Sequence, residues 1–308
     1  MSNLCRLYCA VAFLCGFGAS CAAFAAEAWI AEKVEKPELP REIVAQSLAP
    51  APSRIPAMLT ATAESGGISR AWYAEPTSRY RHGILGDNIE GGALAAELAN
   101  GRRISYRLNE LHVFEDLYPR IADLDGDGKS EIVTILSSLI SGSAVAVFAP
   151  SGETFEPVSR TPFVGRPFRW LNIAAIAPFG GGRIPEIAIV TTPHIGGKLA
   201  FLRLENRRLR IVAAADNFSN HAIGSTELRL STIADVDGDG RVDLALPSAD
   251  RKRLRIVTLD RRNIREIAFA DLPAAIDKAI AVEGPAGNPV FTVGLENGAV
   301  YRIHRPQR

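Results

Sequence analysis

A thirteen-residue sequence that occurs twice constrains the fold of this chain more than any other feature. Ile121–Val133 (IADLDGDGKSEIV) returns 112 residues later as Ile233–Ala245 (IADVDGDGRVDLA). Ile176–Ala188 (IAPFGGGRIPEIA) stands between them, at offsets of 55 and 57 residues, with the same frame but without most of the acids. A fourth, more diverged copy is expected to begin at Ile280. Self-similarity at such a period is typical of repeat architectures, in which each repeat is one supersecondary unit.

The segments between the copies predict strands rather than helices. They are short and rich in β-branched residues, and Gly, Asn and Asp turns separate them, as at 93–98 and 102–108. Only Leu272–Ala281 has a composition that suits one or two helical turns. We therefore expect an all-β chain, a β-propeller of about five four-stranded blades, over residues 67–308.

Each complete copy carries an acidic loop with the spacing of a calcium site. Acids at positions 1, 3, 5 and 9, a Gly at position 6 and a backbone carbonyl at position 7 bring oxygen atoms around one point. Two carboxylates 4 Å apart repel by about 4 kcal/mol at an effective dielectric constant of 20, and a dication turns that repulsion into coordination. Magnesium prefers fewer protein ligands and keeps its waters, so Ca2+ is favoured at both sites. The predicted ligands are Asp123, Asp125, Asp127, the Lys129 carbonyl and Glu131 in the first loop, and Asp235, Asp237, Asp239, the Arg241 carbonyl and Asp243 in the second.

Two other interpretations of the acidic loops are weaker. An EF-hand needs a bidentate Glu at position 12 and flanking helices, but position 12 is Thr134 in one loop and Leu246 in the other, and strands are expected to follow both. A solvated acidic turn without metal is the second alternative, because Asp-Gly is common in turns. The repetition of the whole spacing argues against it, which leaves a calcium hairpin between two strands.

The two Asp-x-Asp-Gly-Asp-Gly-x-x-[Asp/Glu] loops resemble the FG-GAP/VCBS repeats of exported bacterial proteins and of the integrin α-subunit propeller. The resemblance implies a β-propeller with calcium in the hairpins between the first and second strands of its blades. Integrin-type propellers have seven blades, for which this chain is too short. In the third copy Pro178, Gly180 and Gly182 replace the three Asp ligands and only Glu186 is kept, so no metal is predicted there.

The N-terminus is typical of an exported protein. Residues 1–25 carry a single charge, an apolar run and an Ala-rich end, which predicts a signal peptide cleaved after Ala25. Lipid attachment at Cys21 is the alternative, and both place the protein in the periplasm or outside the cell. All four cysteines lie in this segment, so thiol chemistry is excluded from the mature chain. Residues 26–66 are rich in Pro and Ala and predict a linker or arm, with a short helical piece around Glu42–Leu48.

A polar funnel is predicted at the end of the propeller opposite the calcium hairpins. The residues just before the innermost strand of each blade would line it, and such a pocket suits a glycan or peptide. The alternative is that these are turn and cap residues with Trp170 in the core. The candidate ligand-binding residues are Glu115, Arg169, Trp170, Asn220, His221 and Glu227.

Three histidines share a local phrase, namely His82, His194 and His221. A metal site built from the three is one interpretation. The favoured alternative is that they are equivalent turns whose imidazoles bond to the backbone.

Composition and motifs limit the function. The formal charge of +1 lacks the basic footprint of a nucleic-acid binder, and no span of the mature chain is long and apolar enough to cross a membrane. The usual catalytic motifs are absent. We therefore expect an exported, monomeric calcium-binding propeller that acts as a non-catalytic binding or scaffolding module for a protein or glycan. The alternative is a propeller enzyme that cleaves an extracytoplasmic polysaccharide, with Glu115 and Glu227 as its carboxylate pair.

Overall fold

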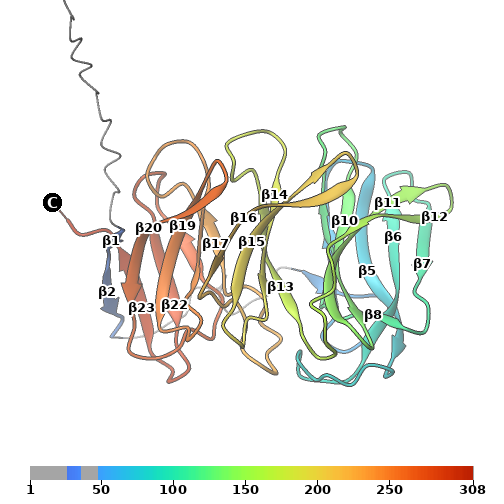
Figure 1. Cartoon of the computed structure of the whole chain (residues 1–308), viewed down its shortest axis with the longest axis horizontal. Coiled ribbons are helices and arrows are strands. Elements are labelled where there is room, and N and C mark those ends of the chain that lie inside the picture. The colour runs from blue at the N-terminus through green and yellow to red at the C-terminus, as the bar shows by residue number, and fades with distance from the viewer. Residues whose placement is uncertain (1–25, 36–47, 308) are drawn as a thin grey trace, which may run out of the picture.

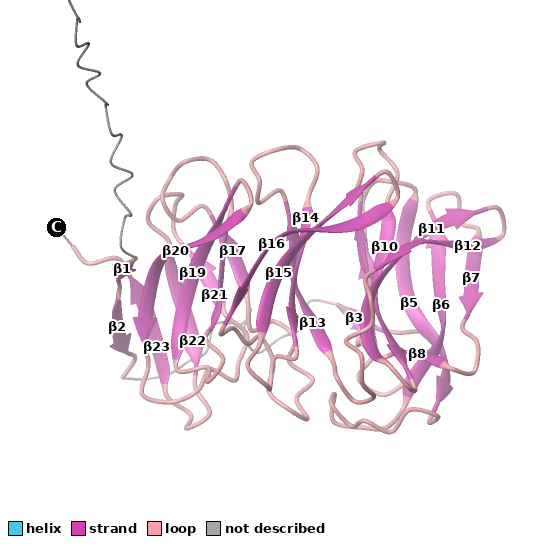
Figure 2. Cartoon of the chain, viewed as in Figure 1, coloured by secondary structure: helices cyan, strands magenta, loops and turns pink. Residues whose placement is uncertain are grey.

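The computed structural model describes residues 26–35 and 48–307, and every regular element in these ranges is a β-strand (Figure 2). The all-β class is therefore confirmed. The helical turn expected at Leu272–Ala281 is wrong, since 272–280 form an irregular connection between two strands. The signal peptide and all but the last residue of the helical piece around Glu42–Leu48 lie outside the described residues.

The strands follow one another as antiparallel meanders joined by short loops. In chain order they are β1 Glu27–Ala28, β2 Ile30–Lys33, β3 Ala49–Pro50, β4 Leu59–Thr62, β5 Ile68–Thr77, β6 Glu90–Leu98, β7 Arg103–Arg107, β8 His112–Phe114, β9 Arg120–Ala122, β10 Glu131–Ser138, β11 Gly142–Ser151, β12 Thr154–Arg160, β13 Leu171–Ala177, β14 Glu186–Thr191, β15 Lys198–Glu205, β16 Arg208–Asp216, β17 Thr232–Ala234, β18 Asp243–Pro247, β19 Arg253–Asp260, β20 Asn263–Asp271, β21 Ala281–Glu283, β22 Val290–Gly294 and β23 Val300–His304.

These strands form four sheets. The meander β13-β14-β15-β16 makes one sheet by itself, β17-β18-β19-β20 makes a second together with β1, and β21-β22-β23 makes a third together with β2. The remaining sheet has ten strands, because β8 pairs with both β6 and β10 and so joins the meander β4 to β7 to the meander β9 to β12. The strand pattern follows the repeat in the sequence, with one meander for each copy.

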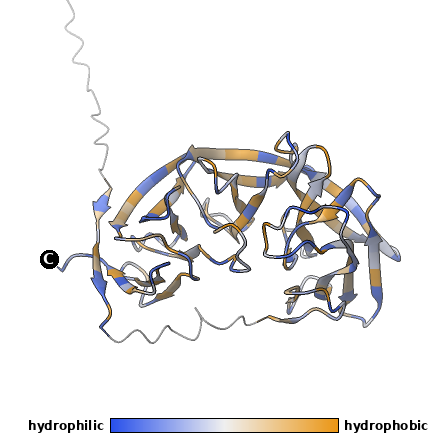
Figure 3. Cartoon of the chain, turned by 90° about the horizontal axis from the view of Figure 1, so that it is seen from below, coloured by the Kyte–Doolittle hydropathy of each residue, from blue (hydrophilic) through white to orange (hydrophobic). Residues whose placement is uncertain are grey.

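The sheets stand side by side in a row that curves into an open arc (Figures 1 and 3). The closed propeller expected from the repeats is therefore wrong: the sheets do not form a complete ring. Hydrogen bonding through β8 also merges two meanders into one sheet, so the count of five separate blades is not obtained.

The segment expected to be an arm contributes strands to both ends of the arc. Strand β2 pairs antiparallel with β23, and β1 pairs parallel with β20, so the blue N-terminal strands lie beside the red C-terminal ones in Figure 1. Trp29, between β1 and β2, is buried against Phe291. Strands β3 and β4 belong instead to the first sheet. The N-terminal strands thus complete the last two sheets.

Apolar side chains fill the spaces between successive sheets. Alternation along each strand places one set of side chains on each face, and both faces of the central strands are covered, so β10 and β18 are buried along their whole length. Each hairpin between the first two strands of a repeat adds one anchor. The anchors are Leu124, Phe179 and Val236, the second residues of the three loops, and all are at most 1% exposed. They hold the hairpins against the core along one edge of the arc, where the corresponding strand ends of successive sheets lie.

Candidate metal centres

The three repeated loops lie at equivalent places in the fold. The first connects β9 to β10, the second connects β17 to β18, and the loop without Asp ligands connects β13 to β14. Each therefore follows the first strand of its meander, and no helix flanks it. The predicted arrangement of strand, loop and strand is confirmed for all three.

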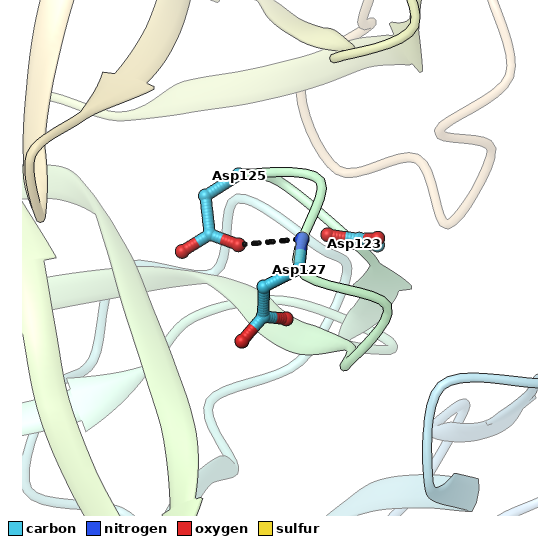
Figure 4. Close-up of side chains that lie close together, drawn as sticks. All are labelled: Asp123, Asp125 and Asp127. Carbon is cyan, nitrogen blue, oxygen red and sulfur yellow. Dashed lines mark hydrogen bonds between the residues drawn. The ribbon is translucent and has the colours of Figure 1, made fainter.

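The first acidic loop brings its three aspartates together. The carboxylate oxygens of Asp123, Asp125 and Asp127 lie within 4.8 Å of one another (Figure 4). Asp123 accepts hydrogen bonds from the N–H groups of Gly126 and Gly128, at 2.7 and 2.9 Å. Backbone groups therefore hold the aspartates in place and use only part of their acceptor capacity.

The second acidic loop repeats this geometry almost atom for atom. Asp235, Asp237 and Asp239 form the same cluster, and Asp235 accepts from Gly238 and Gly240 at 2.7 and 2.9 Å. Glycine is required at position 6, because Gly128 and Gly240 both have φ of +83°, a region that other residues adopt only with strain. The side chains of Lys129 and Arg241 at position 7 pair with Asp127 and Asp239.

The acid at position 9 of each loop is buried beneath the three aspartates. Glu131 is 6% exposed and Asp243 is 1% exposed. Each accepts a hydrogen bond from the loop's anchor residue, Leu124 N–H at 2.9 Å and Val236 N–H at 3.0 Å. Burial, followed by repulsion from the neighbouring aspartates, raises the pKa of Glu131 to about 7 and that of Asp243 to about 6. Both sites therefore concentrate negative charge around a partly desolvated carboxyl group.

The third loop neutralises its buried acid in another way. Glu186, at position 9, is 1% exposed and bonds to the Nε and a terminal guanidinium nitrogen of Arg203 on β15. The same step of the strand register places Ala149 beside Glu131 and Thr258 beside Asp243. Arg203 thus supplies a positive charge in the loop that lacks the aspartates. In the two loops that have the aspartates, the equivalent position holds a neutral residue. Sequence reasoning missed Arg203, whose only signal is that it is a charged residue within an apolar strand.

The predicted funnel residues lie along the opposite edge of the arc, at the strand ends away from the acidic loops, and three of them meet. Trp170 donates from Nε1 to the backbone carbonyl of Glu115 at 3.0 Å, and its ring lies 4.7 Å from that of His221. All three side chains are buried. Arg169 lies at the edge of the same cluster, beside Trp170 in the lining of a small cavity. These predicted funnel residues therefore lie close together, but most of their polar groups are buried.

Asn220 and Glu227 take other positions. The backbone carbonyl of Asn220 accepts from Asn172 at 3.2 Å, and the Asn220 side chain is buried. Glu227 forms an ion pair with Arg229, two residues away. Glu115, its proposed catalytic partner, is itself bonded to His82 and Ser137. Both carboxylates thus have partners inside the chain.

A groove runs along the inner strands of the arc. It has a volume of about 350 Å³ and is lined by residues of β4, β9 and β13 and by the segment before β17. Tyr118 and Arg120 lie in it, with the Arg120 guanidinium 4.2 Å from the Tyr118 ring. Thr62 and Ser231 add hydroxyl groups. The groove therefore combines polar groups with an aromatic ring. The sequence analysis predicted such a combination only at the funnel.

Comparisons with known proteins give partial structural similarities alone. No protein-family model and no curated protein matches the chain. An exotype rhamnogalacturonan lyase, YesX, matches at 16% identity over 89% of this chain and 51% of that chain, with a TM-score of 0.49. The rhamnogalacturonan lyase YesW matches at 15% identity, 89% and 52% coverage and a TM-score of 0.47. A Bacillus licheniformis rhamnogalacturonan lyase PL11 matches at 14%, 89%, 52% and 0.48. This chain spans about half the length of these structures. No helix in the described ranges is long and apolar enough to cross a membrane.

Proposed function

We propose that this chain is an exported, calcium-binding module of the FG-GAP/VCBS type that binds a protein or glycan partner without catalysis. Two calcium ions would fix the hairpins along one edge of the arc. The sheets would then present their inner groove as a rigid surface. The signal peptide and the FG-GAP/VCBS likeness are parts of this proposal.

The observation that carries the calcium assignment is the treatment of the buried acid in the three loops. Glu186 is neutralised by Arg203, whereas Glu131 and Asp243 have neutral residues at that register position and three converging aspartates above them. A buried carboxylate without a counter-charge is costly. A divalent cation bound between the aspartates would supply at both loops the charge that Arg203 supplies at the third.

The donor set favours calcium among divalent cations. Carboxylate and carbonyl oxygens are hard ligands, and Ca2+ accepts six to eight of them in a flexible geometry. Magnesium demands fewer, more regular ligands at shorter distances. The described loops offer no imidazole or thiolate, which the softer transition metals prefer. When bound, the ion would neutralise the aspartates and tie the hairpin to the strand that carries position 9.

The groove along the inner strands supports the binding role. Its volume of about 350 Å³ lies within the range of small-ligand sites. Tyr118 offers an aromatic face for a sugar ring or an apolar side chain, and Thr62 and Ser231 offer hydroxyl groups for hydrogen bonds. These features suit a glycan or a peptide equally.

Calcium titration with single-site variants tests the metal assignment. Isothermal titration calorimetry should give two Ca2+ ions per chain in the wild type, one in Asp125→Asn or Asp237→Asn, and none in the double variant. Asp216→Asn is the matched control, because Asp216 is an exposed acid on a strand, away from both loops. Three sites in the wild type, no sites, or loss of calcium in the control would overturn the assignment.

Ligand capture tests the groove. A glycan array and a peptide pull-down with the exported protein should identify a ligand whose binding falls on Tyr118→Ala and on addition of chelator. Unchanged capture by Tyr118→Ala would place the binding surface elsewhere. N-terminal sequencing of the exported protein should begin at Ala26, whereas a lipid-modified cysteine would favour attachment at Cys21.

A further inference from the structure

Two histidines far apart in the sequence line one small cavity at the edge of the arc opposite the acidic loops. His82 comes from the connection between β5 and β6, and His194 from the connection between β14 and β15. Phe168, Trp170 and Thr192 complete most of the lining. The cavity has a volume of about 30 Å³, which is the space of a single water molecule or ion.

The hydrogen bonds of His82 determine which of its ring nitrogens carries the proton. Nδ1 lies 2.6 Å from Oε1 of the buried Glu115. The other carboxylate oxygen accepts from Ser137 and Ser143, so Glu115 acts as an acceptor and His82 Nδ1 as the donor. The proton on Nδ1 leaves a lone pair on Nε2, for which no partner is found among the described residues.

His194 is held in the same manner by another histidine. His221 donates from Nε2 to the carbonyl of Ser225 at 2.9 Å, so its Nδ1 is an acceptor. His194 donates from Nε2 to that Nδ1 at 3.0 Å, which leaves its own lone pair on Nδ1. Burial lowers the pKa of His194 to about 4 and that of His221 to about 3. Both rings are therefore neutral at pH 7.

We propose that His82 Nε2 and His194 Nδ1 bind a divalent transition-metal ion of the zinc, copper and nickel class in this cavity. Neutral imidazole is the ligand these ions prefer. Metal-binding histidines almost always donate the other ring N–H to a fixed acceptor, and both histidines do so. Two protein ligands leave coordination positions open to water or to a partner's side chain.

The cavity's surroundings define the roles of the neighbouring groups. Glu115 is a positioning residue and supplies negative charge next to His82, while His221 positions His194 and has no nitrogen left for the metal. Two cations oppose the bound ion: Arg169, which also lines the cavity, and Arg251, which acts on both His194 and His221. The three-histidine site, which was the less favoured interpretation of the shared phrase, thus becomes a site with two ligands and one supporting histidine.

Zinc binding compared between histidine variants tests this proposal. Titration of the wild-type protein with ZnCl2 in excess Ca2+, followed by calorimetry and by melting temperature, should show a site absent from His82→Gln and from His194→Gln. His304→Gln is the matched control, since His304 lies on β23, outside the cluster. Glu115→Gln should weaken binding by about 10- to 100-fold, as expected for loss of a group that orients a metal ligand.

The comparison stays informative if zinc also binds elsewhere or if a variant is less stable. Zinc held by the acidic loops contributes equally to all variants, so only the difference reports on the cavity. Co2+ substitution gives a second readout, because its visible absorption in the folded protein should change in His82→Gln but not in His304→Gln. Equal zinc affinity in the wild type and in the two cavity variants would overturn the proposal.

Discussion

The loop around Glu131 and the loop around Glu186 share one backbone plan but balance their buried acid differently. Glu131 lies under three aspartates with Ala149 beside it, whereas Glu186 lies under Pro and Gly residues with Arg203 beside it. The third loop has its cation built into the neighbouring strand. The difference supports our proposal that the hairpin needs a positive charge at this place, which Arg203 supplies in one loop and a bound calcium ion would supply in the other.

A third way of balancing a buried acid occurs at the opposite edge of the arc. Glu90, the first residue of β6, is 3% exposed, and its pKa is raised to about 9 by burial and by the nearby Glu115, Asp87 and Asp116. It therefore remains protonated at neutral pH. Together with the internal cation Arg203 and the proposed calcium ions, this proton would be a third way in which the fold accommodates a buried carboxyl group.

Removal of calcium should have the largest effect on stability. At a calcium concentration 100 times Kd, each site contributes about 2.7 kcal/mol, so EGTA should cost about 5 kcal/mol in total. For a chain of this size that lowers Tm by roughly 10 °C or more, as measured by differential scanning calorimetry. The Asp125→Asn/Asp237→Asn variant should melt at the EGTA temperature with or without calcium. A wild-type Tm that does not respond to EGTA would contradict the comparison.

Removal of the internal cation should have the next largest effect. Arg203→Met leaves Glu186 buried without a partner, which should cost about 2–3 kcal/mol, at the low end for broken buried pairs because Arg203 is partly exposed. Urea denaturation at saturating calcium measures it. Arg210→Met is the control, since Arg210 is exposed on β16 directly opposite Arg203. Adding Glu186→Gln should recover part of the loss, and no recovery would argue against the ion pair as the cause.

The protonated acid should make stability depend on pH. The folded pKa of Glu90 lies above the unfolded value, so the folded state keeps the proton longer. Stability present below about pH 4.5 is lost as the pH rises toward 9. Glu90→Gln removes this titration, so its stability advantage over the wild type should grow by up to about 1.4 kcal/mol per pH unit between pH 5 and pH 9. Urea denaturation across this range measures the gain, and a difference that stays constant with pH would show that Glu90 does not titrate as described.

Transfer of the internal cation to the first loop should have the smallest effect. Ala149 is only partly buried, so Ala149→Arg can place a guanidinium beside Glu131. We expect about 1 kcal/mol of added stability without calcium, as for a typical intramolecular hydrogen bond, and weaker calcium binding at this loop alone. Calorimetry of Ala149→Arg in the Asp237→Asn background isolates that site. Tighter calcium binding would break the analogy between the two loops.

The sequence predicted the local features of this molecule well. The acidic loops are defined by residue spacing within nine positions. Their flanking strands, their equivalence and their common place at one edge of the arc could therefore be predicted. Arg203 could not, because it meets Glu186 only through the register of β14 against β15, which pairs Ile187 with Leu202 and which no local pattern in the sequence specifies. His82 and His194 were recognised as similar phrases, but their convergence depends on how separate meanders pack. The merging of two meanders into one sheet also depends on β8, a three-residue strand with no distinctive pattern.

The pairing of the first strands with the last ones has a consequence for how the chain is made. Residues 27–33 are synthesised before their partners on β20 and β23, which lie more than 230 residues further along the chain. Contacts between such distant segments are slow to form. The last two sheets must therefore wait, incomplete at one edge, until β20 and β23 have been produced. A chain cut short before β20 would leave both N-terminal strands without partners, and such unpaired edges invite aggregation.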